Sequence, residues 1–173
     1  MKQPRVLVAG IGNIFFGDDA FGVEVARRLS ARELPDGVRV VDFGIRSLDL
    51  AYAILDNYDL TILVDATPRG QSPGTLYAIE PEVEEESCQE ANRTVVEAHS
   101  MDPVQVLRLA KSMDGHLTGR ILLIGCEPEQ FTAEAEGQMG LSRTVQVAAD
   151  RAVLLIESLV TDFLNENAKL HTL

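Results

Sequence analysis

The sequence predicts an α/β fold with three layers: a mostly parallel, twisted sheet of about five strands, covered by helices on both faces. Short runs of β-branched and aliphatic residues alternate along the chain with segments whose apolar residues recur every three or four positions. This β-α-β-α-β order is typical of parallel sheets, because parallel neighbours need a crossover connection and helices supply it. The chain has 173 residues and a hydrophobic content of 46%, which is enough to bury one core.

The first half of the chain is predicted to contain three buried strands and two helices. Residues 5–10, 38–43 and 60–65 are compact apolar runs rich in valine, leucine and isoleucine. Residues 20–33 carry an apolar stripe at helical spacing, which a proline and a glycine close. Residues 47–55 repeat the pattern over a shorter length. These five segments follow the βαβαβ order of a doubly wound sheet.

The second half adds two strands and two helices. Residues 74–79 are predicted as a short edge strand, and residues 120–126 as a fifth strand. An aspartate followed by proline marks the start of a helix at 102–113, since aspartate caps and proline suits the first turn. Residues 143–164 have the pattern of a long closing helix. We therefore expect a single domain over residues 1–164 and a loose tail over residues 165–173.

The loop after the first strand is the most informative stretch of the sequence. Residues 6–22 read VLVAGIGNIFFGDDAFG. Gly10 and Gly12 supply two glycines of a dinucleotide fingerprint, but Phe15 occupies the third position. Asp18 and Asp19 lie where a pyrophosphate would need backbone N–H groups. Carboxylates at this position indicate a cation rather than a nucleotide.

Composition excludes several classes of partner. A net charge of −12 argues against binding to nucleic acid or to anionic membranes. The longest purely apolar run, residues 152–156, is too short to span a bilayer. Cys88 and Cys126 form neither a disulfide framework nor a zinc motif, so we expect reduced thiols in a cytoplasmic protein.

The expected topology places two acidic positions in one crevice. If the two crossovers run in opposite directions, the first and third strands become neighbours, and their carboxyl ends meet at the switch point. Asp18 and Asp19 follow the first of these strands, and Asp65 ends the other. His99, one of three histidines, lies just before the helix start at Asp102 and can face the same strand ends. Two carboxylates and an imidazole suit zinc, nickel or another borderline divalent ion, and leave coordination positions open.

Each of these residues also has a plainer explanation when taken alone. Asp18 or Asp19 could be only a helix N-cap, with Asp18 the better candidate for that role. Asp65 could cap the turn at Thr67. His99 could be a loop histidine with no chemical role.

Three motifs of the chain closely resemble those of the hydrogenase maturation proteases, the endopeptidases that trim the C-terminal extension of [NiFe]-hydrogenase large subunits. They are GIGNIFFGDDAFGV in the first loop, ILVDA at 62–66 and AHSMDPVQVL from Ala98, in colinear order up to GLSRTV at the last helix. The resemblance implies a twisted sheet between helices and a metal site at Asp19, Asp65 and His99. It also implies that nickel carried by the substrate, rather than a resident metal, is recognised there, with zinc or cadmium as a possible surrogate.

The chain departs from the family pattern at two positions. Some relatives have glutamate where this chain has Asp19, so the shorter side chain must approach the metal more closely or Asp18 must share its work. Residues 42–47, DFGIRS, replace the D-G-x-T-like stretch after the second strand. This loop flanks the crevice, and we predict that Gly44 and Arg46 contact the substrate, with Arg46 on a carboxylate or carbonyl of the bound tail.

The resulting prediction is a processing endopeptidase that acts on a precursor of a [NiFe]-hydrogenase large subunit after nickel insertion. A metal-polarised carbonyl and an activated water form the simplest mechanism, with Asp19 or Asp18 as the base. Nothing in the sequence resembles a serine or cysteine triad. Two alternatives stay open: a hydrolase with its own resident divalent ion, and a protein that senses nickel loading without cutting. A monomer is expected, because the enzyme must dock on a much larger precursor.

Overall fold

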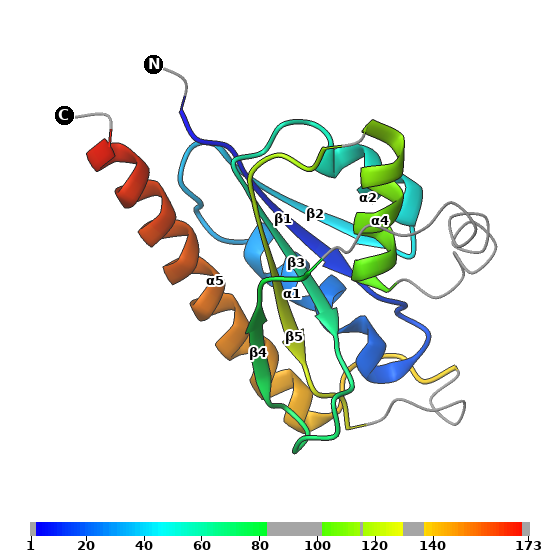
Figure 1. Cartoon of the computed structure of the whole chain (residues 1–173). Helices are drawn as coiled ribbons and strands as arrows, with labels where there is room; N and C mark the ends of the chain where they lie inside the picture. Colours follow the sequence, from blue (N-terminus) through cyan, green and yellow to red (C-terminus); the bar gives the residue numbers. More distant parts are fainter. Residues whose placement is uncertain (1–2, 83–101, 115, 130–136, 171–173) are drawn as a thin grey trace.

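The sheet contains the strands that the sequence predicts, in an order that alternates sides. A computed structural model describes residues 3–82, 102–114, 116–129 and 137–170. Within these ranges the strands are β1 (Val6–Ile11), β2 (Val38–Gly44), β3 (Leu60–Ala66), β4 (Leu76–Ile79) and β5 (Arg120–Cys126). Their order across the sheet is β2-β1-β3-β5-β4 (Figure 1). The first crossover leads to one side of β1 and the second returns to the other, so β1 and β3 are neighbours as expected.

Four of the five strands are parallel, and the exception lies at an edge. β1 pairs in parallel with β2 and β3, and β3 pairs in parallel with β5. β4 pairs antiparallel with β5, from Leu76 opposite Cys126 to Ile79 opposite Leu123. The prediction of a mostly parallel sheet with an edge strand near residues 74–79 is confirmed.

The helices cover both faces of the sheet. They are α1 (Phe21–Ser30), α2 (Ser47–Ile54), α4 (Pro103–Asp114) and α5 (Arg143–Leu170), with a short 3₁₀ helix, η1 (Gly17–Ala20), before α1. α1 and α5 pack on one face around Val8, Ile62 and Ile124, whereas α2 and α4 pack on the other around Leu7 and Leu63 (Figure 1). Alternate residues of the buried strands thus serve two cores, and the three-layer prediction is confirmed.

The last helix is longer than predicted. α5 continues to Leu170, so residues 165–170 are helical and do not belong to a loose tail. No glycine or proline follows Leu164 to stop the helix. The Asn167 side chain also donates a hydrogen bond of 2.8 Å to the carbonyl of Phe163, one turn earlier. Residues 171–173 of the expected tail lie outside the described residues. No described helix combines the length and apolar character needed to cross a bilayer.

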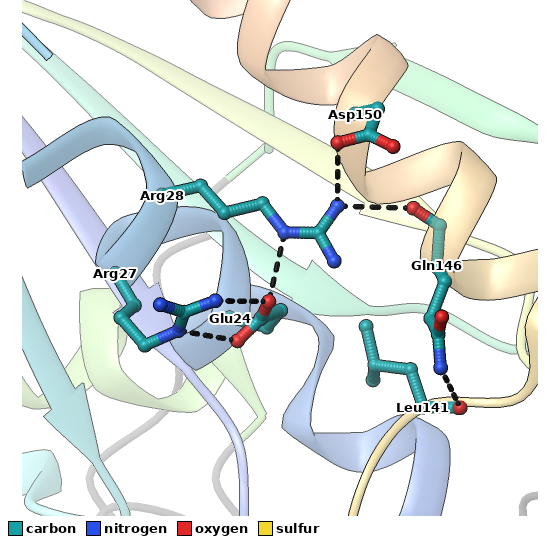
Figure 2. A network of polar contacts seen from close by, with 6 residues as sticks. All are labelled: Glu24, Arg27, Arg28, Leu141, Gln146 and Asp150. Atoms are coloured by element: carbon teal, nitrogen blue, oxygen red, sulfur yellow. Dashed lines mark hydrogen bonds and ion pairs between the residues drawn. The ribbon is translucent and has the colours of Figure 1, made fainter. Parts of the chain in front are cut away.

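A polar network fastens α1 to α5 on the outer face of this layer (Figure 2). Arg28 donates to Glu24 on its own helix and, through Nη1, to the carbonyl of Gln146 at 3.1 Å and to Asp150 at 2.8 Å on α5. Arg27 adds two further hydrogen bonds to the Glu24 carboxylate. These contacts lower the pKa of Glu24 to about 2. The first helix is therefore tied to the last by charges as well as by the core.

Candidate active site

The loop after β1 lies against the carboxyl end of β3 because two glycines leave room for it. Gly12 has a φ of +137°, and a Cβ there would lie 1.8 Å from the carbonyl oxygen of Asp19. A Cβ on Gly22, in the first turn of α1, would lie 2.0 Å from the carbonyl oxygen of Val64. Only glycine allows such approaches. The 3₁₀ turn that carries the two aspartates is thereby held beside the residue that precedes Asp65.

Asp65 is almost completely enclosed at the end of β3. Its exposed fraction is 6%, and it directly follows Val64, the last residue of β3 paired with β1. Burial raises the pKa of the Asp65 carboxyl well above its usual range, and the charge of Asp19 raises it further. Two carboxylates from the loop after β1 and from β3 therefore share one electrostatic environment, as the topology predicts.

Asp19 is half-buried and oriented by the loop that it belongs to. Its Oδ2 accepts a hydrogen bond of 2.7 Å from the backbone N–H of Asn13, and its own N–H donates to the carbonyl of Phe16 at 3.1 Å. Burial raises the pKa of Asp19, while the bond from Asn13 acts in the opposite direction. The Asn13 side chain in turn accepts the N–H of Phe15 at 3.0 Å. Asp19 is the aspartate of the loop whose charge raises the pKa of Asp65.

Asp18 points into the protein instead. It is fully buried, with Oδ2 accepting the N–H of Glu129 at 2.9 Å and Oδ1 accepting the N–H of Ser142 at 2.7 Å. Both oxygens are therefore engaged by the segment after β5 and by the residue before α5. Because both oxygens are engaged in this way, the geometry favours Asp19 over Asp18 as the candidate base, and that role stays a prediction. The geometry corrects the expected role of Asp18 as a cap of its own helix, since its partners belong to other segments.

The loop after β2 is joined to the loop after β1. The N–H of Gly12 donates to the carbonyl of Gly44 at 3.1 Å, and Gly44 has a φ of +55°. Arg46 folds back on the same loop: its Nε donates to the carbonyl of Phe43 at 3.1 Å, and its Nη2 donates to the carbonyl of Asp42. Both residues predicted to bind substrate lie at the carboxyl edge of the sheet. The guanidinium of Arg46, however, donates its hydrogen bonds to carbonyls of its own loop.

The histidine of the predicted trio cannot be placed. His99 lies outside the described residues, as does His171. His116 is described and exposed, but it precedes β5 and so lies near the amino end of that strand, away from the acid pair. Accordingly, the described residues hold no group of three His, Cys, Asp or Glu side chains arranged for a metal ion.

Asp102 is a third carboxylate near the site that the sequence indicated only as a helix cap. It does cap α4, accepting the N–H of Val104 at 2.9 Å. Its charge also raises the pKa of Asp65. The sequence feature that could have indicated a role of Asp102 at the site is its position three residues after His99, at the start of the helix.

Two other groups at this edge have structural roles. The buried carboxylate of Glu127, just after β5, accepts the N–H groups of Arg69 and Gly70 and the hydroxyl of Tyr77, which lowers its pKa. Cys126 is fully buried, and burial raises the pKa of its thiol to about 12. Such a thiol is not a nucleophile at neutral pH, and Cys126 is a residue of the core.

The arrangement suits chemistry that begins with a cation. The charge of Asp19 raises the pKa of Asp65, and a divalent ion bound by both carboxylates would offset that repulsion. One of them is buried in the sheet and the other is held by a hydrogen bond from its own loop, so both are preorganised. A site with this donor set can polarise a carbonyl and activate water once an ion is present.

The comparisons with known proteins agree with this fold and identify the family of the chain. A family model described as hydrogenase maturation protease matches residues 23–159. A protein of Methanocaldococcus jannaschii named for that family is 32% identical over 158 residues, covering 90% of this chain and 96% of the relative.

Solved structures lead to the same family. The hydrogenase-maturating endopeptidase HybD from E. coli superposes with a TM-score of 0.70 at 26% identity, covering 91% of this chain and 93% of that one. The hydrogenase 2 maturation peptidase from a Thaumarchaeota archaeon gives a TM-score of 0.67 at 33% identity, covering 91% and 98% of the two chains.

A doubly wound α/β fold that carries an acid pair at its switch point, together with these relatives, defines the class of the protein: it is a hydrolase. The chain belongs to the hydrogenase maturation protease family. It is a peptidase, as its relatives and structural neighbours are.

Proposed function

We propose that this protein is the endopeptidase that removes the C-terminal extension from the precursor of a [NiFe]-hydrogenase large subunit once nickel has been inserted. The observation that carries the proposal is the acid pair, Asp19 and Asp65, at the β1/β3 switch point. Family membership supplies the class of substrate, and the acid pair supplies the reason for cleavage to depend on a metal ion.

Nickel enters this proposal as part of the substrate. Asp19 and Asp65 supply carboxylate oxygens, and His99 supplies the imidazole that completes a mixed nitrogen and oxygen set suited to a borderline divalent ion. A three-residue set leaves coordination positions for ligands of the precursor. Recognition is then restricted to precursors that carry the ion, and Zn²⁺ or Cd²⁺ can stand in for it in binding experiments.

The location and assembly state follow from the substrate. The precursor is processed where hydrogenase subunits are assembled, so we place the enzyme in the cytoplasm. We also propose that it acts as a monomer, since the acid pair and its loops come from one chain and must face a much larger protein.

Mass spectrometry of a nickel-loaded precursor incubated with the protein tests the proposal. Loss of a C-terminal peptide from the loaded precursor, with the nickel-free precursor left intact, is the expected result. Cleavage of unrelated peptides after addition of free metal would instead identify a hydrolase with its own resident ion. Binding of the loaded precursor without a change in mass would identify a sensor that does not cut.

Substitutions of the proposed site residues test whether processing depends on them. Asp65→Ala and His99→Ala should each abolish processing while the circular dichroism spectrum stays that of the wild type. Full activity in both variants would rule out the proposed site. Asp36→Ala, at an exposed position, serves as the control and should process normally.

A further inference from the structure

We propose that Asp18 is a positioning residue, which holds Asp19 at the site by fastening η1 to two segments behind it. This inference rests on the proposed function for its consequence in catalysis, although the positioning itself can be measured without substrate. The two neighbours differ in exposure: Asp18 is fully buried, whereas Asp19 is half-buried. The charge of Asp19 raises the pKa of Asp65.

The first step of the argument is the reach of the Asp18 carboxylate. Its two oxygens accept N–H groups that lie 111 and 124 residues away, those of Glu129 and Ser142. One belongs to the segment after β5 and the other precedes α5. Because both donors are backbone groups of other elements, the carboxylate fixes the position of η1 relative to the end of the sheet and to the last helix.

The second step is the short path from Asp18 to Asp19. Both residues belong to η1, a single 3₁₀ turn of four residues. Successive side chains of such a helix point roughly 120° apart, so a turn fixed by Asp18 also fixes the direction of Asp19. The backbone of this turn adds two contacts: the N–H of Gly17 donates to the carbonyl of Gln138 at 2.8 Å, and the N–H of Asp19 donates to the carbonyl of Phe16.

The third step is a reporter that the structure provides. The backbone N–H of Asn13 donates to Oδ2 of Asp19 at 2.7 Å. The ¹H chemical shift of this amide therefore depends on where the Asp19 carboxylate lies. It can be read in a ¹⁵N-labelled sample of the free enzyme.

The test compares three isosteric changes of acid to amide. Asp18→Asn keeps the size of the side chain but presents an NH₂ group to one of the two N–H donors, so the contact is lost. Asp19→Asn gives the amide shift of Asn13 when the carboxylate itself is absent. Glu127→Gln is the matched control, because Glu127 is also a buried carboxylate that accepts backbone N–H groups, but those of residues 69 and 70 in the turn after β3.

We expect Asp18→Asn to shift the Asn13 amide resonance toward its position in Asp19→Asn, and to lower kcat/KM for processing about tenfold or more. Glu127→Gln should lower the melting temperature and leave the Asn13 resonance in place. The inference is overturned if Asp18→Asn leaves that resonance unchanged, if Glu127→Gln moves it equally, or if Asp18→Asn moves it without loss of kcat/KM. A wild-type enzyme that does not cut the precursor would refute the proposed function, while the resonance would still decide whether Asp18 positions Asp19.

Discussion

Asp18 and Asp19 occupy adjacent positions with the same side chain, yet their surroundings give them different chemistry. Both oxygens of Asp18 accept backbone N–H groups of other segments, which satisfy the buried carboxylate. Asp19 accepts a hydrogen bond from the N–H of Asn13, and its charge raises the pKa of Asp65. The sequence reveals the pair but not this division, because the partners of Asp18 are more than one hundred residues away and follow no local pattern.

The ionised carboxylate of Asp65 should cost stability. Its folded pKa lies above the value of the unfolded chain, so the cost begins as pH rises through the unfolded value and is complete above the folded one. We expect Asp65→Asn to raise the melting temperature at pH 8, by about 2–4 °C for each kcal/mol gained, and to abolish processing. Differential scanning calorimetry at pH 8 and at pH 3 measures the effect, which should disappear at the lower pH.

The exposed Asp36 supplies the control for this measurement. Asp36→Asn should leave the melting temperature at pH 8 nearly unchanged, since surface substitutions usually change stability by less than about 0.5 kcal/mol. A fall in melting temperature for Asp65→Asn would mean that the carboxylate stabilises the fold, and would contradict the stability cost assigned to its ionised form.

The helices and strands show which parts of the fold local patterns can predict. The predicted bounds of all strands of the described sheet lie within two residues of the observed ones, and the central strands β1 and β3 are buried on both faces. The antiparallel direction of β4 was not predicted, since a run of four residues carries no signal of direction. α5 ends six residues beyond its predicted end at Leu164, because the polar residues that follow Leu164 resemble a tail in the sequence. Polarity there reflects exposure of the helix, not its end.

The network between α1 and α5 should make stability depend on acidity. The pKa of Glu24 is lowered from 4.5 to about 2, so its contribution is present above pH 4.5 and is lost as the pH falls toward 2. Glu24→Gln should destabilise the protein by about 1 kcal/mol at pH 7, because the pairs with Arg27 and Arg28 lie near the surface. Urea unfolding across this pH range measures the difference, which should vanish near pH 2.

Glu33→Gln, at an exposed position close to the end of α1, is the matched control for Glu24. It should change the free energy of unfolding by less than about 0.5 kcal/mol at either pH. An equal loss in both variants would show that general surface charge, rather than the link to α5, sets the acid sensitivity.

At the scale of the whole molecule, the carboxyl edge of the sheet combines the acid pair with exposed apolar side chains. Hydrogen bonds join the loops that carry them: the N–H of Gly137 donates to the carbonyl of Phe15, and Gly12 donates to Gly44. The exposed apolar residues of these loops and of the following turn of α2 are Ile14, Phe15, Ile45, Leu48 and Met139. An apolar margin around a polar centre is suited to a protein substrate.

Substitution within this margin should weaken binding of the precursor more than the cleavage step. Phe15→Ser and Ile45→Ser are each expected to raise KM about fivefold with little change in kcat, since neither side chain belongs to the acid pair. Steady-state processing of the nickel-loaded precursor measures both constants. Leu154→Ser, on the exposed face of α5, is the control: it has a similar exposed fraction, 59% against 54% for Phe15, and should leave KM unchanged. Equal KM values in all three variants would place the docking surface elsewhere.

The contacts between the start and the end of the chain also determine when the enzyme can become active during its synthesis. Three hydrogen-bonded pairs join residues that lie 122 to 125 positions apart, so the first partner is synthesised long before the second. They are Asp18 with Ser142, Arg28 with Asp150, and Arg32 with Glu157. The loop that carries Asp19 leaves the ribosome early, but the residue before α5 that holds Asp18 leaves it 124 residues later. A nascent or truncated chain without α5 should therefore hold its acid pair unassembled, and we expect cleavage to begin only after α5 has been synthesised.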